Sequence, residues 1–453
     1  MKFFFLTVMM SGLAMAGNND LSHRPKSFST RAGKAVFADF TEAQYTISYD
    51  MNTKLATAHA EIDLTVVEDG LIVFDSVQDP TMIKLDGAIV TATAQKTPNN
   101  ETTVRVLDAS AAAGSHKLSV DVPLKELVEF TADGVKSAFW TSDLDERNFM
   151  ERYLPASFEY DQVKMSFDIT FVGAKTTQVI YTNGIVKEKG RNAYTISYPK
   201  HFNASSIFFH TVPQGQTNEI KASYRSIDGR DIPVTIYSSK SLWSGAGGLD
   251  RFKTKSFEVF NELEKDYGAW PHEQLIIYNA GMGGMEYCGA TMTDYSAVGH
   301  EMFHSYFARG VMPANGNSGW LDEALASWRD NAYPRSESLS GSSSMSSHPY
   351  YTRITDDAAY SFGARFMSYL DGKLASKGGL KPFMRYMVDK RIFSPLFVEE
   401  FAKEMSTQTG ISVEADFKKY TYGGQATPQK SVNSRRAAGI HRKMSLKELR
   451  NLL

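Results

Sequence analysis

The chain has 453 residues, a formal net charge of −2 and a single cysteine, Cys288. A nearly neutral chain gives no electrostatic reason to expect a nucleic-acid partner, and one cysteine cannot form an internal disulfide. Beyond the N-terminus we find no stretch of about twenty apolar residues, the length that a membrane-spanning helix needs.

The first sixteen residues are typical of a secretory signal peptide. Lys2 gives the positive start, residues 3–13 the apolar stretch, and an A-x-A cleavage site ends at Ala16. The apolar stretch is too short to cross a membrane, and no cysteine follows it directly as a lipid anchor would require. We therefore expect a secreted or periplasmic protein that begins near Gly17.

Residues 36–240, after an N-terminal extension at residues 17–35, have the pattern of a β domain. Polar and apolar residues alternate in stretches such as 44–49 and 61–67, as in strands with one buried face. Turn formers separate these stretches, and no long run of helical period interrupts them. We expect a large antiparallel β-sandwich-like domain.

A second domain is expected at residues 241–422. Residues 249–267 have helical spacing, residues 274–278 read as a strand, and helices are expected at residues 380–389 and 396–405. The whole chain is therefore predicted to have an α+β fold with two domains. The roughly 430 residues that follow the signal peptide are enough for two cores.

Two segments have the composition of irregular structure. Residues 336–347 are rich in serine, which predicts a loop that acts either as a lid or as a plain surface connection. Residues 423–453 form a polar, basic tail that could contact an anionic surface, although disorder is the simpler expectation. Within this tail, Ser445 can cap a short amphipathic helix that continues through Leu453.

The most informative motif is HEMFH at residues 300–304, followed by eighteen residues (305–322) and Glu323. Histidines four positions apart lie on one face of a helix, so His300 and His304 can reach one metal ion. Glu323, on a second helix, would be the third ligand. Three protein ligands leave one tetrahedral position for water, as a catalytic zinc requires.

The local sequence predicts the limits of both helices and the chemistry. Asp294 can cap a helix across residues 295–309, Gly310 can end it, and Ser318 can cap the second helix. One Zn²⁺ per chain would acidify a bound water, and Glu301 would take the proton as general base before passing it to a leaving amine. We therefore predict hydrolysis of peptide bonds.

Four other segments resemble the gluzincin zinc aminopeptidases, the aminopeptidase N-like group. GGMEY at 283–287 resembles the group's G-x-M-E-N signature, and H-E-x-x-H, eighteen residues and Glu is its zinc signature. WLDEA at 320–324 and YSFGA at 360–364 resemble its W-x-[ND]-E-G and Y-x-x-G-A segments. RYLP at 152–155 resembles a segment of its N-terminal β domain. The resemblance implies a thermolysin-like, mostly α catalytic domain, in a short form without the large helical C-terminal domain of many relatives.

The resemblance also implies which tyrosine supports catalysis. A tyrosine hydroxyl near the metal can donate a hydrogen bond to the oxyanion that develops during peptide hydrolysis. The matching residue is Tyr360, but the 37 positions from Glu323 to Tyr360 are fewer than is usual in the family. Tyr350 and Tyr351 therefore remain alternatives.

Glu286 is the implied determinant of N-terminal selectivity. A carboxylate at the end of the cleft pairs with the free α-ammonium of a peptide in a charge-assisted hydrogen bond, and an internal residue offers no such cation. Gly284 and Met285, just before it, are implied to bind the substrate, since glycine lets the backbone approach a peptide and pair with it like an added strand.

The resemblance also implies something about two further positions. Asp143 is the candidate for a second carboxylate aimed at the same amine, and Asp145 or Glu146 could serve instead. Arg309 stands where the family usually has a small or amide residue. It could contact a substrate carboxylate, but an outward-facing arginine at a helix C-terminus is the simpler expectation.

We expect a zinc aminopeptidase that acts on peptide substrates, with an open cleft that admits long peptides. One alternative is a zinc endopeptidase without N-terminal selectivity. Another is a non-catalytic binding protein on the same scaffold, although the presence of His300, Glu301, His304 and Glu323 argues against it. The sequence leaves the preferred N-terminal residue and the oligomeric state open.

Overall fold

The computed structural model describes residues 23–98, 102–141, 149–240, 242, 248–314, 316–348, 350–351, 354–423 and 444–453. The predicted signal peptide lies outside these residues, as do Asp143 and its alternatives Asp145 and Glu146. Within the described ranges, no helix is both long enough and apolar enough to cross a membrane.

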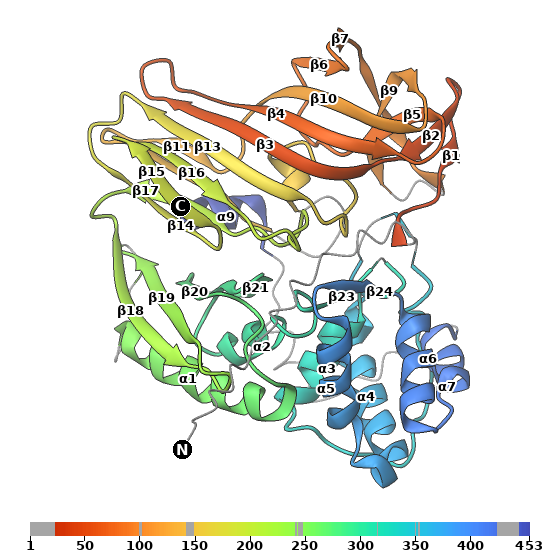
Figure 1. Cartoon of the computed structure of the whole chain (residues 1–453). Coiled ribbons are helices and arrows are strands. Elements are labelled where there is room, and N and C mark those ends of the chain that lie inside the picture. The colour runs from red at the N-terminus through yellow and green to blue at the C-terminus, as the bar shows by residue number, and fades with distance from the viewer. Residues whose placement is uncertain are drawn as a thin grey trace, which may run out of the picture.

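Strands dominate the first half of the described chain, in the upper part of Figure 1. In spatial order, sheet 1 contains β1 (Phe28–Ser29), β2 (Lys34–Phe37), β5 (Gly70–Phe74), β9 (Thr103–Ala111) and β8 (Ala92–Lys96). Sheet 2 contains β15 (Ile185–Gly190), β16 (Ala193–Ser197), β13 (Lys164–Val172), β3 (Asp39–Asp50), β4 (Leu55–Val66), β10 (Gly114–Pro123), β6 (Met82–Leu85) and β7 (Ala88–Ile89). Sheet 3 contains β11 (Val128–Phe130), β12 (Val135–Phe139), β17 (Phe209–Pro213) and β14 (Gln178–Thr182).

Sheets 2 and 3 face each other across an apolar core. Alternate residues of β3 and β4 are buried, as the polar and apolar alternation predicts. The ring centroids of Phe167 in β13 and Phe139 in β12 lie 6.0 Å apart. Tyr49 in β3 shares a 3.0 Å hydrogen bond with Ser137 in β12. These contacts join the two sheets into a sandwich.

The expectation of purely antiparallel sheets is wrong at two pairs. β3 pairs with β13 in parallel, and β2 pairs with β5 in parallel. Alternation shows which face of a strand is buried, but it carries no information on the direction of a neighbour that is distant in the chain. The sheets of this half are therefore mixed.

A fourth sheet connects the two halves of the chain. It contains, in order, β18 (Thr217–Arg225), β19 (Asp231–Ser239), β20 (Leu275–Asn279), β22 (Ala290–Thr293) and β21 (Gly284–Tyr287). β18 and β19 lie before the boundary predicted at residue 240, yet β19 pairs in parallel with β20. This pairing favours a boundary before residue 217.

Helices dominate the second half, in the lower part of Figure 1, and pack in a second apolar core. They are α1 (Gly248–Tyr267), α2 (Val298–Phe303), α3 (Leu321–Asp330), α4 (Phe362–Lys373), α5 (Leu380–Arg391), α6 (Val398–Thr409) and α7 (Glu414–Thr421). The 3₁₀ turns η4 (Asp357–Tyr360) and η5 (Ala375–Lys377) also lie here, whereas η3 (Met150–Arg152) precedes β13 in the first half. The short strands β23 (Val311–Pro313) and β24 (Ser394–Leu396) pair in parallel. α1 and α5 contain the helices expected at residues 249–267 and 380–389, whereas α6 begins at Val398, two residues after the expected start at Leu396, which ends β24.

The serine-rich segment is tied to the helices around it. The indole N–H of Trp320 donates to Ser346 Oγ at 2.9 Å, and the Ser346 N–H donates to the Thr421 carbonyl at 2.9 Å. The Ser343 N–H donates to the Tyr420 carbonyl at 2.8 Å. This anchoring favours a structured surface connection over a lid.

The end of the chain forms the short helix expected after Ser445. α9 (Leu446–Leu452) begins with a capping box, in which Ser445 Oγ accepts from the Glu448 N–H and Glu448 Oε2 accepts from the Ser445 N–H. Leu449 is buried in the first core. The Tyr278 hydroxyl of β20 donates to the Leu452 carbonyl at 2.7 Å, which fixes α9 beside sheet 4.

Candidate active site

His300 lies on α2 and His304 caps its C-terminus, so this helix is shorter than the one expected at residues 295–309. Asp294 Oδ1 accepts from the N–H groups of Ser296 (2.6 Å) and Ala297 (3.2 Å), but the N-cap of α2 is Ala297, so Asp294 forms a turn before the helix and is not its expected cap. After His304 the chain turns, and β23 pairs with β24 instead of extending the helix. The four-residue spacing still holds the rings of His300 and His304 together, with centroids 4.7 Å apart.

Glu323 reaches both histidines from the first turn of α3. Its Oε2 lies 2.9 Å from His300 Nε2 and 3.4 Å from His304 Nε2. One donor atom from each of the three residues lies within 4.8 Å of the others, and all three side chains are buried. The structure therefore brings the expected ligand set together.

Hydrogen bonds behind the two histidines fix Nδ1 of each ring away from the predicted metal and direct Nε2 toward Glu323. His300 Nδ1 lies 2.6 Å from Asp330 Oδ2, and His304 Nδ1 lies 3.2 Å from the Phe307 carbonyl. Each acceptor holds a proton on Nδ1, which leaves Nε2 as the nitrogen that can bind a metal once the proton shared with Glu323 is lost. His304 Nε2 is buried, and its nearest acceptor is Glu323 Oε2 at 3.4 Å, too poorly aligned for a good hydrogen bond. Two such imidazoles and a carboxylate fit the donor preference of zinc.

Asp330 is a supporting residue that the sequence analysis missed. It lies seven residues after Glu323 on the same helix, and its Oδ1 accepts from Arg329 Nη1 at 3.1 Å. The Arg329 guanidinium in turn forms two hydrogen bonds to the Glu262 carboxylate of α1, at 2.9 and 2.6 Å. This chain of contacts fixes the orientation of His300. The seven-residue spacing is the only sequence signal for it.

Glu301 lies against the backbone of β21. A Cβ added to Gly284 would come within 1.9 Å of Glu301 Oε1, so only glycine leaves room for this carboxylate. Burial raises the pKa of Glu301, the nearby histidines oppose the rise, and Glu286 and Glu323 add to it. The predicted base is thus held between the histidine helix and the strand assigned to the substrate.

Glu286 faces the same centre, because one of its oxygens lies within 4.8 Å of donor atoms of Glu301 and His304. It is also paired with Arg309, whose Nη2 lies 3.0 Å from Glu286 Oε1. Both side chains are buried, with exposures of 2% for Glu286 and 1% for Arg309. The expected outward-facing Arg309 is therefore wrong. The turn after His304 directs Arg309 inward instead of letting a helix end there.

The strand that carries Glu286 stands at the edge of sheet 4. In the described chain, β21 pairs only with β22, and its other side has no strand. Gly284 belongs to this edge, and the side chain of Met285 is buried in the first core. A peptide could bind these two residues only through their backbone groups, as an added strand.

Tyr360, at the end of η4, faces the ligand set. Burial raises its pKa, and the negative charges of Glu323 and Glu286 and a hydrogen bond to Glu323 add to the rise. The hydroxyl therefore stays protonated and remains able to donate a hydrogen bond. The structure thus brings Tyr360 into contact with Glu323.

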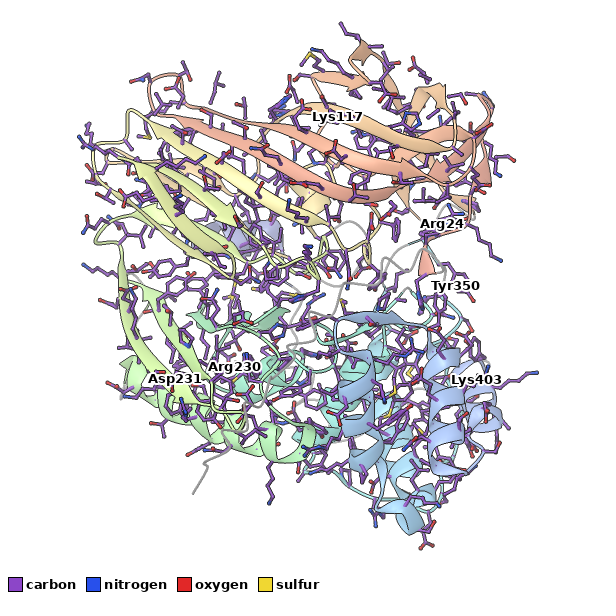
Figure 2. The ribbon with its side chains drawn as sticks, viewed as in Figure 1. Arg24, Lys117, Arg230, Asp231, Tyr350 and Lys403 are labelled. Carbon is purple, nitrogen blue, oxygen red and sulfur yellow. The ribbon has the colours of Figure 1, made fainter. Side chains whose placement is uncertain are left out.

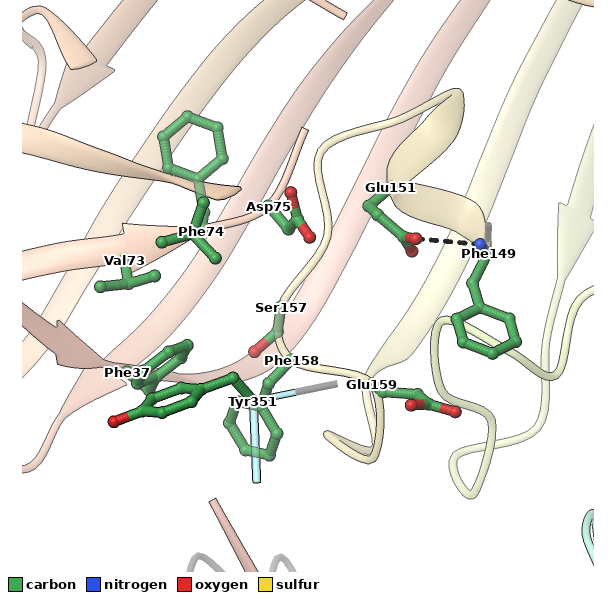
Figure 3. Close-up of a pocket in the computed structure, with 11 residues that line it drawn as sticks. Phe37, Val73, Phe74, Asp75, Phe149, Glu151, Ser157, Phe158, Glu159 and Tyr351 are labelled. Carbon is green, nitrogen blue, oxygen red and sulfur yellow. Dashed lines mark hydrogen bonds between the residues drawn. The ribbon is translucent and has the colours of Figure 1, made fainter. Parts of the chain in front are cut away.

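The two alternative tyrosines lie elsewhere. Tyr350 is 52% exposed and accepts a hydrogen bond from Asn317 at 3.3 Å (Figure 2). Tyr351 packs against Phe37, with ring centroids 6.1 Å apart, and lines a cavity of about 30 Å³ beside β2 and β5 (Figure 3). No predicted metal ligand lines this cavity. Geometry thus favours Tyr360 over both.

Comparisons by sequence find no relative: no protein-family model matches the chain, and no curated protein matches it. Solved structures do match. An M1 zinc metallopeptidase mutant from Deinococcus radiodurans, bound to a Tyr-Ser-Ala substrate, has a TM-score of 0.64 at 14% identity. The match covers 87% of this chain and 96% of that one. A two-domain M1 zinc metallopeptidase mutant bound to L-tryptophan has a TM-score of 0.62 at 15% identity, over 90% and 99% of the two chains.

A longer protein shares the same fold. Leukotriene A4 hydrolase from Saccharomyces cerevisiae has a TM-score of 0.65 at 14% identity, over 88% of this chain and 70% of that one. At such low identities the similarity establishes the fold of the M1 zinc metallopeptidases. It does not by itself transfer substrate or selectivity.

Proposed function

We propose that this protein is a zinc-dependent peptidase that removes N-terminal residues from peptides. The observation that carries the proposal is the convergence of His300, His304 and Glu323 beside Glu301, with one donor atom of each of the three within 4.8 Å of the others. The shared fold of the M1 zinc metallopeptidases supports the same reaction class. Zinc held by these three residues would supply a Lewis acid toward water and the scissile carbonyl.

The chain's own residues account for the proton transfers. Glu301 accepts a proton from the attacking water and returns it to the amine nitrogen as the C–N bond breaks. Its raised pKa suits both steps, since the carboxylate must bind the proton and release it within one turnover. Tyr360 donates a hydrogen bond to the oxyanion that forms on the carbonyl oxygen.

The edge of sheet 4 supports the proposed binding mode of the peptide. A substrate that pairs with β21 passes along Gly284 and reaches Glu286 near its N-terminus. The carboxylate of Glu286 would then bind the free α-ammonium, which an internal peptide residue lacks.

An endopeptidase is the second candidate, because Glu286 is already paired with Arg309. Arg309 compensates the negative charge that would attract an ammonium group, and this weakens selection for a free N-terminus. Hydrolysis of a fluorogenic amino-acid amide, compared with its N-acetylated form, separates the two functions. A strong preference for the free amine supports the aminopeptidase, and equal rates would exclude it.

We also propose that the protein is exported, on the basis of the signal-peptide pattern in residues 1–16. Edman sequencing of the protein from periplasmic and culture fractions tests this. A mature N-terminus near Gly17 is expected, and an intact Met1 on the cytoplasmic protein would contradict it.

A further inference from the structure

Three side chains of metal-binding type meet at the seam between the two halves of the chain. His201 lies between β16 and β17, His272 between α1 and β20, and Cys288 in the turn between β21 and β22. One donor atom of each lies within 4.8 Å of the others, the same criterion that the candidate catalytic ligands meet. None of the three belongs to the catalytic set.

His272 has the hydrogen-bond pattern of a metal ligand. Its Nε2 lies 3.0 Å from the carbonyl oxygen of Ser305, so Nε2 must carry the proton and Nδ1 the lone pair. Nδ1 is buried without a hydrogen-bond partner among the described residues, and the whole residue is only 4% exposed. His304 shows the same arrangement with its two nitrogens exchanged, which is how metal-binding histidines are oriented.

His201 supplies a second such nitrogen. Its Nε2 is also buried without a hydrogen-bond partner in the described residues. Its ring stacks on Phe393, with centroids 3.6 Å apart and an interplanar angle of 16°, and this contact fixes the direction in which Nε2 points. A buried polar atom without a partner costs free energy, and two of them beside one thiol call for a common ligand.

The turn that carries Cys288 is fitted closely against His272. A Cβ on Gly289 would come within 2.9 Å of His272 Cβ, and its φ of +62° also favours glycine. The Cys288 backbone is held by first-half residues, since its N–H donates to the Ser206 carbonyl and its carbonyl accepts from Asn183 Nδ2. Cys288 Sγ itself makes a long contact, 3.7 Å, to the Arg309 carbonyl and also interacts with the side chain of Ser206.

We propose that His201, His272 and Cys288 form a second metal site, for a thiophilic d¹⁰ cation (Zn²⁺ or Cu⁺). Two neutral imidazoles and one thiolate are the donors that these ions prefer. Around a tetrahedral zinc such donor atoms stand about 3.5 Å apart, so small side-chain rotations complete the site. The positive charge of the neighbouring Arg309 is compensated by Glu286. The bound ion joins the β-rich half to sheet 4, a structural role that does not depend on the proposed peptidase activity.

The chain allows a direct test, because Cys288 is its only cysteine. The full-length protein is stripped of metal and loaded with Co²⁺, whose bond to a thiolate gives a charge-transfer absorption in the near ultraviolet. The band is expected in the wild type and in His304→Gln, which disables the catalytic ligand set, and is expected to be absent from Cys288→Ser. Elemental analysis after Zn²⁺ loading should give two equivalents for the wild type and one for Cys288→Ser.

In a parallel experiment, the metal-free wild type and Cys288→Ser are each loaded with Cu⁺ under anaerobic conditions, and the copper bound by the two proteins is compared. Cys288-dependent binding of Cu⁺ with only one Zn²⁺ equivalent would assign the site to Cu⁺. His201→Gln, at a partly exposed position, should lose the same equivalent and replaces Cys288→Ser if that variant fails to fold. One Zn²⁺ equivalent in the wild type, no thiolate band and no Cys288-dependent copper would overturn the proposal.

Discussion

The predicted zinc-ligand half of the candidate site and its proposed amine-binding half are built in different ways. His300 and His304 are placed by helical spacing, and their outer nitrogens are fixed so that the inner ones face Glu323. Glu286, in contrast, is placed by a strand and bound to Arg309. The predicted zinc-ligand half is thus prepared for a cation, whereas in the proposed amine-binding half Arg309 already compensates the negative charge of Glu286. A motif can thus specify the reaction and leave the selectivity to a distant residue.

The largest expected effect on activity is in the predicted zinc-ligand half of the site. Glu301→Gln removes the base and keeps the shape, so kcat should fall about 10²–10⁴-fold, the usual contribution of general acid–base catalysis. The variant should still bind zinc, because Glu301 is not a ligand. The measurement is kcat on an amino-acid amide together with zinc content, with the exposed Glu258→Gln of α1 as the matched control. Full activity in Glu301→Gln would refute its role.

The next largest effect distinguishes Tyr360 from the alternative Tyr350. Tyr360→Phe removes the donor beside Glu323 and should lower kcat about 10²–10³-fold, as for other oxyanion donors. Tyr350→Phe, on the exposed rival, should leave kcat unchanged. Steady-state kinetics of both variants measure this. A larger fall in kcat for Tyr350→Phe than for Tyr360→Phe would assign the oxyanion donor to Tyr350.

A smaller effect is expected at the support of His300. Asp330→Asn weakens the hydrogen bond to Nδ1 and should lower zinc affinity about 10–100-fold. Competition with a chelator of known affinity measures this, and the exposed Asp389→Asn of α5 is the control. Equal affinities in the two variants would show that the contact does not orient the ligand.

The smallest expected effect on activity is in the proposed amine-binding half of the site. Glu286→Gln should reduce the preference for free-amine over N-acetylated substrates by about tenfold, through a higher KM for the free amine, which corresponds to about 1.4 kcal/mol. An unchanged preference would favour the endopeptidase. Because the change also leaves Arg309 without its partner, it should destabilise the fold by about 3–5 kcal/mol, so thermal unfolding must be recorded alongside.

Local signals in the sequence were sufficient where the structure depends on near neighbours. The H-E-x-x-H spacing brings the two histidines together, and the Ser445–Glu448 capping box starts α9. The polar and apolar alternation identifies the buried faces of β3 and β4. In each case residues a few positions apart determine the geometry.

Contacts between distant residues account for what could not be predicted. The pairing of β23 with β24 ends α2 early, although the apolar sequence of residues 295–309 is compatible with a longer helix. That early turn then buries Arg309 against Glu286. Likewise, β19 joins β20 across the expected domain boundary. Periodicity carries no information on such partners.

Zinc-dependent hydrolysis is the most direct test of the central claim. Protein stripped of metal should not cleave amino-acid amides, and addition of zinc should restore cleavage in the wild type but not in His304→Gln. Undiminished cleavage by the metal-free protein, or restoration by zinc in His304→Gln, would contradict the account.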